Sequence, residues 1–193
     1  MIQFDKTILK NGLTVIVHTD RSTPFVAVNV CYNVGSKHED PSRTGFAHLF
    51  EHLTFGGSRH VADFDTAVQM AGGANNAFTS NDLTNYYITL PANNIETAMW
   101  LESDRMLGPK FTKKGLDVQK KVVIEEFRQR NLNKPYGDVW HLMRDLAYKV
   151  HPYRWPTIGL VPEHIASATL EDVKDFFFHH YAPNNAVLVI SGN

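Results

Sequence analysis

The sequence has a single cysteine, Cys31, among its 193 residues. One cysteine cannot form a disulfide within the chain, and it excludes the cysteine-rich class of metal site. The sequence also lacks an excess of charge of either sign, because 19 lysine and arginine residues are balanced by 20 aspartate and glutamate residues. A chain with this balance has no general attraction for nucleic acid or for an anionic membrane, so we expect neither as a partner.

Long hydrophobic runs are absent as well. No stretch reaches the roughly 18 consecutive apolar residues that a transmembrane helix requires. Residues 1–6 lack the basic start and apolar run of a secretory signal, so we expect a cytoplasmic protein. What is present is typical of a globular chain, with 43% hydrophobic and 20% charged residues. This composition is sufficient for a substantial core.

The pattern of apolar residues predicts both strands and helices. Runs rich in β-branched residues predict strands at 13–18, 25–33, 83–90 and 186–190. We expect the first two of these strands to pair as antiparallel neighbours. Helical spacing predicts helices at 45–55, 61–71, 94–107, 112–131, 136–148 and 169–180. This order predicts an α+β fold, with one mostly antiparallel sheet covered by helices.

One of these helices carries the segment His48-Leu49-Phe50-Glu51-His52. Histidines four residues apart lie on the same face of a helix, so both imidazoles can reach a single metal ion. Glu51 lies on nearly the same side and can contact water at that ion without being a ligand. Zinc hydrolases use this combination of nitrogen ligands, an open coordination position and a nearby general base. We expect Thr44 or Ser42 to cap the helix.

A catalytic zinc usually takes three protein ligands, and the best candidates for the third are Glu125 and Glu126. Both lie in an otherwise apolar helical segment, where an unpaired buried carboxylate is costly. Glu126 shares a helix face with Gln119 and Val122, whereas Glu125 lies nearer Lys121, so we favour Glu126. The alternative is that both glutamates are solvated and that one forms a salt bridge with Lys121.

The five-residue motif by itself has a second interpretation, in which its polar groups are satisfied without any metal. The other eight histidines fit no metal-binding pattern. His179 and His180 come at a predicted helix end, where their positive charge would interact favourably with the helix dipole. That helix also begins with a predicted capping box, formed by Thr169 and Asp172.

The motif and the downstream Val123-Ile124-Glu125-Glu126 together resemble the zinc peptidases of family M16, which have an inverted motif and include relatives of pitrilysin, insulin-degrading enzyme and the mitochondrial processing peptidase. The resemblance extends over nearly the whole chain. Further matching segments are 11–15, 35–39, 45–48, 72–80, 84–87, 151–153 and 158–159. It is far more specific than the motif alone.

The resemblance implies a role for each matching residue. His48, His52 and Glu126 would bind one Zn²⁺ ion, and Glu51 would be the general base. The segment Asn76-Ala77-Phe78-Thr79 resembles the edge strand with which an extended peptide substrate pairs. An ordinary edge strand is the alternative for that segment.

The sequence departs from the family in two respects. Gln119 stands seven residues before Glu126, where family members commonly carry a glutamate that acts behind the ligands. Members of the family also enclose the substrate in a chamber formed by paired homologous domains. Residues 1–193 resemble only the first of these domains, and we expect its last helix to be absent from them. We therefore expect a zinc endopeptidase domain that is poorly active alone and needs a second homologous domain, subunit or copy of itself. A catalytically silent partner or assembly subunit is the alternative.

Overall fold

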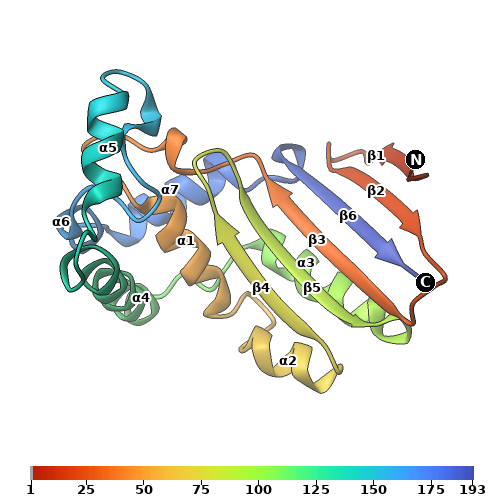
Figure 1. Ribbon diagram of the computed structural model, residues 1–193. Helices are drawn as coiled ribbons and strands as arrows, with labels where there is room; N and C mark the ends of the chain where they lie inside the picture. Colours follow the sequence, from red (N-terminus) through yellow and green to blue (C-terminus); the bar gives the residue numbers. More distant parts are fainter. Residues whose placement is uncertain (1) are drawn as a thin grey trace.

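The structure, a computed structural model, describes residues 2–193. Its centre is a six-stranded sheet in the order β1-β2-β6-β3-β5-β4 (Figure 1). The strands are β1 (Asp5–Ile8), β2 (Thr14–Thr19), β3 (Phe25–Tyr32), β4 (Ala74–Thr79), β5 (Thr84–Pro91) and β6 (Ala186–Gly192). Strands β2 and β6 form a parallel pair, and the other neighbouring pairs are antiparallel. The predicted α+β fold with one mostly antiparallel sheet is confirmed.

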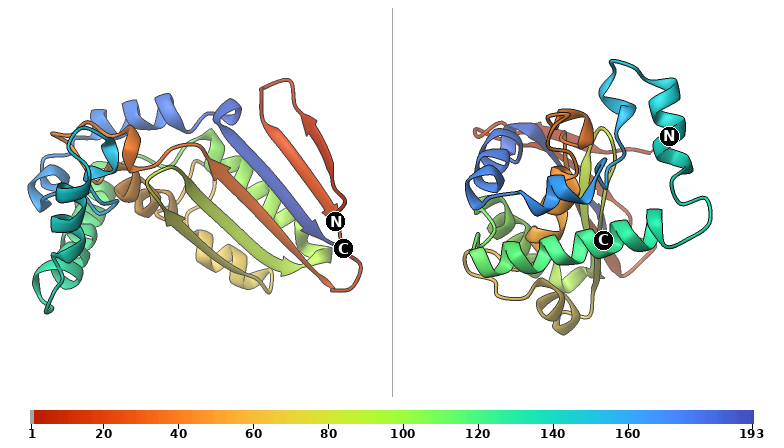
Figure 2. Two further views of the ribbon diagram at one scale, coloured as in Figure 1. Left: turned by 45° about the horizontal axis from the view of Figure 1, so that its top comes forward. Right: turned by 90° about the vertical axis from the view of Figure 1, so that its left-hand side faces the viewer.

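Seven α-helices accompany the sheet in the described part of the chain. They are α1 (Phe46–Phe55), α2 (Phe64–Met70), α3 (Ile95–Leu107), α4 (Lys113–Phe127), α5 (Val139–Ala147), α6 (Pro162–Ala166) and α7 (Leu170–His180). Helix α3 lies against one face of the sheet, and α4 to α7 gather at one end of it, away from β1 and β2 (Figure 2). None of the helices in residues 2–193 has the length and apolar character to cross a membrane.

Alternation along β3 explains how the sheet and helices form one core. Val26, Val28, Val30 and Tyr32 are buried, while the residues between them are partly exposed. This period of two directs every second side chain to the face that helices cover. The same face of the sheet receives buried residues of α1 and α3, so the histidine motif is part of a helix that is packed against the core.

Three sequence predictions need correction. Strands β2 and β3 are not neighbours, because β6 lies between them and pairs with both. The expected helix 112–131 ends as an α-helix at Phe127 and continues as a π-helical turn over Arg128–Leu132. The expected helix 61–71 covers only Phe64–Met70, because Asp63 caps it through its side chain.

Candidate metal centre

Helix α1 presents the two histidines, and its own start differs from the prediction. Its N-cap is Gly45 with φ +92°, so neither Thr44 nor Ser42 caps the helix as expected. The Glu39 carboxylate takes their place, since its two oxygens accept hydrogen bonds from the backbone N–H groups of Gly45 and Ala47, each at 2.8 Å. A Cβ on Gly45 would lie 2.7 Å from Ile165 Cδ1, so close packing as well as φ requires glycine here.

His48, His52 and Glu126 meet where α1 packs against α4. Their ligand atoms all lie within 4.8 Å of one another, and no other such group of three or more histidine, cysteine or acidic residues occurs in residues 2–193. Glu126 Oε2 lies 3.6 Å from His48 Nε2 and 3.4 Å from His52 Nε2. The two helices thus bring together the three residues that the sequence singled out as ligand candidates.

These separations suit a shared metal ion better than direct hydrogen bonds. Nitrogen–oxygen distances of 3.4 and 3.6 Å exceed the usual hydrogen-bond length. Ligand atoms at the corners of a zinc tetrahedron, with bonds of roughly 2.0–2.1 Å, lie about 3.4 Å apart. The donor set of two imidazoles and one carboxylate is also one that zinc takes in hydrolases. The residues present therefore fit a zinc ion.

The protonation states of His48 and Glu126 are those that metal binding requires. Burial, together with the neighbouring His52 ring, lowers the pKa of His48 to about 4, so this imidazole is neutral at pH 7. The His52 and His48 rings lower the pKa of Glu126, which is therefore ionised. Arg130 Nη2 lies 2.8 Å from Glu126 Oε1, which leaves Oε2 facing the histidines. A neutral imidazole and a carboxylate are the forms that bind a metal ion.

Glu125 and Glu126 differ clearly in surroundings. The Glu125 side chain is 52% exposed and its oxygen lies 3.5 Å from Arg128 Nη1, on the outer side of α4. The expected contact with Lys121 is not among the salt bridges of the described residues. Only Glu126 reaches the histidines, so the geometry favours it over its neighbour.

Glu51 lies one residue before His52 and points toward the edge strand. Thr79 Oγ donates a hydrogen bond to Glu51 Oε2, which links α1 to the end of β4. Burial raises the pKa of Glu51, and the Thr79 hydrogen bond opposes this change. A partly buried carboxylate with a raised pKa and one hydrogen-bond donor already in place has the properties of a general base.

Strand β4, which carries the predicted peptide-binding residues, lies at the edge of the sheet. It pairs only with β5, so in the described residues its other edge is open. Asn76 and Phe78 are exposed on one face, while Ala77 and Thr79 are partly buried toward α1. Ala77 N donates to the side-chain oxygen of Asn76 at 2.8 Å. These features suit an edge that accepts another strand.

Gln119 lies on α4, two helical turns from Glu126. It lines a cavity of about 270 Å³ together with Leu53, Gly56 and Leu116. The structure therefore places Gln119 beside the end of α1. Its role behind the metal ligands stays a prediction.

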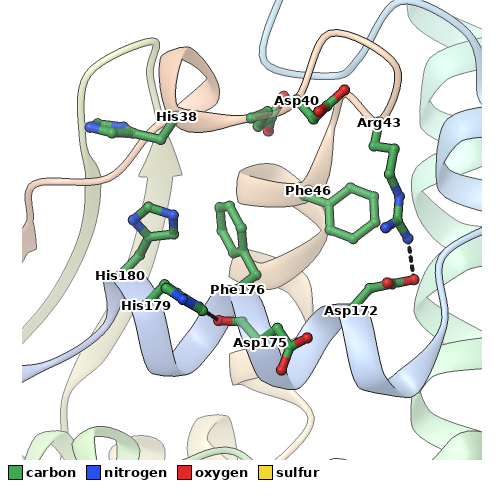
Figure 3. A pocket seen from close by; sticks show the side chains of 10 residues that line it. His38, Asp40, Arg43, Phe46, Asp172, Asp175, Phe176, His179 and His180 are labelled. Carbon is green, nitrogen blue, oxygen red and sulfur yellow. Dashed lines mark hydrogen bonds and ion pairs between the residues drawn. The ribbon is translucent and has the colours of Figure 1, made fainter.

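A separate cavity of about 240 Å³ lies between the loop before α1 and helix α7 (Figure 3). Arg43 forms an ion pair with Asp172 at one end of it. His179 Nδ1 lies 2.7 Å from the backbone oxygen of Asp175, in the last turn of α7, as expected for a histidine at the C-terminal end of a helix. The predicted capping box of α7, formed by Thr169 and Asp172, is confirmed.

Comparison with known proteins shows which proteins this chain is similar to. The family described as insulinase (peptidase family M16) matches residues 14–158. The zinc protease PqqE of Helicobacter pylori is 35% identical over 188 residues, which are 96% of this chain and 42% of that protein. A crystal structure of a protease from Helicobacter pylori superimposes with a TM-score of 0.95 at 34% identity, over 100% of this chain and 46% of that chain.

A more distant structure shares the fold. The periplasmic protease PqqL from Escherichia coli has a TM-score of 0.87 at 24% identity, over 98% of this chain and 22% of that chain. Both solved structures match almost the whole described fold. The present chain, however, spans less than half the length of these relatives.

Proposed function

Because this chain belongs to the insulinase family (peptidase family M16), we propose that it is the zinc-binding half of an endopeptidase that cleaves extended peptides. The observation that carries the proposal is the convergence of His48, His52 and Glu126, with Glu51 on the same helix beside an open strand edge. In this proposal the three convergent residues hold one Zn²⁺ ion.

In this proposal each of these residues has its own role in peptide hydrolysis. A bound zinc ion would supply a Lewis acid that polarises a carbonyl group and makes water more acidic. Glu51 Oε1 accepts a proton from the attacking water and later passes it to the leaving amine. Thr79 holds the other oxygen of Glu51, which fixes the orientation of the carboxylate. Arg130 holds Glu126 in the same way.

Strand β4 aligns the peptide in this proposal. Backbone groups of Asn76 to Thr79 pair with an extended segment of the substrate, which brings one of its carbonyl groups beside Glu51. Gln119, in place of a glutamate, would act by hydrogen bonding rather than by charge. The role of an edge strand in binding rests on the open edge of β4 and on its contact with Glu51.

The activity of the whole protein requires more than these residues. We propose that a second homologous domain or subunit, or a second copy of this chain, closes over the site. The length of the relatives, of which this chain covers 42% and 46%, supports that proposal. We also propose a cytoplasmic location, which fractionation of cells that express the protein would test.

Substitution of Glu51 by Gln tests the proposed base. The variant should keep one zinc ion per chain, measured by atomic absorption, and lose peptide cleavage by about 10²–10⁴-fold. Full turnover in the variant would contradict the role of Glu51. A wild-type chain that holds zinc but cleaves no peptide, even when a second homologous half is supplied, would favour the catalytically silent alternative.

The ligand assignment has a matched pair of variants on α4. Glu126→Gln should lose stoichiometric zinc, and so should His48→Ala, because each removes one of three ligands. Glu125→Gln changes the neighbouring exposed glutamate in the same way and should keep zinc. Zinc loss in Glu125→Gln with retention in Glu126→Gln would reverse the assignment.

A further inference from the structure

The cavity between the loop before α1 and helix α7 has no part in the proposed function. Its volume is about 240 Å³. None of the three proposed metal ligands lines it, and neither does Glu51. Figure 3 shows the rings of Phe46 and Phe176 side by side between the loop that carries Asp40 and helix α7, which carries Asp175. The chemistry of these side chains indicates what the cavity can bind.

Planar rings follow one another along the cavity. The ring centroids of Phe46 and Phe176 are 6.2 Å apart, and those of Phe176 and His180 are 4.8 Å apart. The His38 ring, from the loop, lies 5.5 Å from that of His180. Burial lowers the pKa of both imidazoles, so both rings are neutral at pH 7. Neutral rings do not repel a cation, and the faces of aromatic rings attract one.

The cavity also has carboxylates that no basic side chain neutralises. Asp40 and Asp175 form no salt bridge within residues 2–193. Asp40 Oδ1 accepts hydrogen bonds from Ser42 N and Ser42 Oγ, but no group in that part of the chain donates to Asp40 Oδ2 or to the Asp175 carboxylate. In Figure 3 the two aspartates lie on opposite sides of the cavity. Their charges create a negative potential that favours a positively charged ligand.

Arg43 already shows how a guanidinium group fits into this cavity. Its guanidinium carbon lies 5.3 Å from the centroid of the Phe46 ring, and the group forms an ion pair with Asp172. A ring face and a carboxylate are the two features that hold a guanidinium group. Phe176 and Asp175 offer the same two features, and no lysine or arginine in the described part of the chain engages either of them.

We propose that this cavity binds an organic cation, which is either a free amine or guanidinium compound or a basic side chain of another protein. The Phe176 ring would lie against the charged group, and the carboxylates of Asp40 and Asp175 would accept its hydrogen bonds. The inference goes beyond the proposed function and does not depend on it, because neither the metal ligands nor strand β4 take part.

Titration with butylguanidinium tests the cavity, and butylurea, which has nearly the same shape without the charge, is the matched control ligand. Binding to the full chain is followed by the NMR shifts of its backbone amides. We expect butylguanidinium to bind at least about tenfold more tightly than butylurea, because cation–π attraction and charge-assisted hydrogen bonds act only on the cation. The largest shifts should occur in residues 38–43 and in α7. Equal affinities of the two ligands would overturn the proposal.

Variants connect this preference to the cavity. Asp40→Asn and Asp175→Asn should each weaken binding of butylguanidinium about three- to fivefold. Asparagine at position 40 can still accept the hydrogen bonds from Ser42, which preserves the loop. Glu171→Gln is the matched control, because Glu171 is an exposed acidic residue of α7 that does not line the cavity, and it should leave the affinity unchanged. Unchanged affinity in both aspartate variants would contradict the site.

Removal of the internal guanidinium group gives the opposite expectation. Arg43→Gln leaves the Asp172 carboxylate and the Phe46 ring available to a ligand, so it should tighten binding of butylguanidinium about threefold. Weaker binding in this variant would contradict the charge argument.

A blocked peptide of four glycines with one central arginine distinguishes the two sources of the cation. Binding at least as tight as that of butylguanidinium would identify a protein side chain as the ligand, and binding about tenfold weaker would identify a free compound. Either result supports the site. If neither cation binds, the proposal is wrong, and the proposed peptidase function is unaffected.

Discussion

Single carboxylates outside the proposed metal centre hold the helix that carries both histidines. Glu39 caps the start of α1 through two backbone N–H groups. Asp104, near the end of α3, holds the loop that follows α1. Its carboxylate oxygens accept hydrogen bonds from Ser58 Oγ, His60 N and the His60 ring. The segment with both histidines is thus anchored at each end by a buried acidic side chain.

Asp104 makes a testable contribution to stability against acid. Burial acts to raise the pKa of Asp104, but its hydrogen bonds with Ser58 and His60 outweigh burial and lower the pKa to about 2. A carboxyl group with a folded-state pKa below its unfolded value stabilises the protein above that unfolded value, near 4, and loses this effect as the pH falls toward 2.

Asp104→Asn should therefore lower the free energy of unfolding at pH 7 by about 2 kcal/mol. The difference from wild type should shrink as the pH falls from 4 to 2, as measured by urea unfolding at each pH. Asp117→Asn, at an exposed position of α4, is the control and should change stability little. A difference that grows toward low pH would contradict the prediction.

Strand β4 and helix α1 are linked by a side-chain hydrogen bond. Strand β4 ends at Thr79, whose hydroxyl group donates to Glu51 on α1. Any peptide that pairs with β4 is therefore placed relative to the proposed base by a direct contact between the two elements. The N–H group of Ala77, which donates to the Asn76 side chain, is a donor that such a peptide would use instead.

Removal of this donor tests the pairing of peptide with β4. Proline is tolerated in edge strands where its missing N–H group faces away from the sheet. Ala77→Pro should reduce kcat/KM for unstructured peptides by about tenfold, with zinc content unchanged, because one backbone hydrogen bond to the substrate is lost. Ala77→Ser keeps the N–H group and should retain activity. Equal activity in the two variants would argue against pairing along β4.

The molecule as a whole presents its proposed metal centre at one end of the sheet, next to an open strand edge. The relatives that match it are more than twice as long as the matched part. In a peptidase, exclusion of water and orientation of the substrate contribute much of the rate, and both need surfaces on more than one side of the peptide.

We expect residues 1–193 to bind zinc stoichiometrically yet to cleave unstructured peptides at least about tenfold more slowly than a protein that also carries a second homologous half. The comparison needs both proteins loaded with zinc and assayed at equal concentration. Equal rates would show that these residues need no second half for catalysis.

Sequence alone was sufficient for several features whose cause is local. The spacing of His48 and His52 places both on one helix face by helical geometry, and Thr169 with Asp172 forms a cap from neighbouring residues. The same local periodicity was enough for β3, α3 and the α+β class. Resemblance to a family added the peptide-binding role of Asn76 to Thr79 and the expectation of a second homologous domain.

Only the tertiary structure decided how distant segments meet. Strand β6 enters between β2 and β3, because pairing between strands depends on contacts far apart in the chain that no local pattern encodes. The cap of α1 comes from Glu39 rather than Thr44, because the loop before the helix folds so that the Glu39 carboxylate reaches the first turn. Glu126 rather than Glu125 faces the histidines because the packing of α4 against α1 sets which side of that helix is inward.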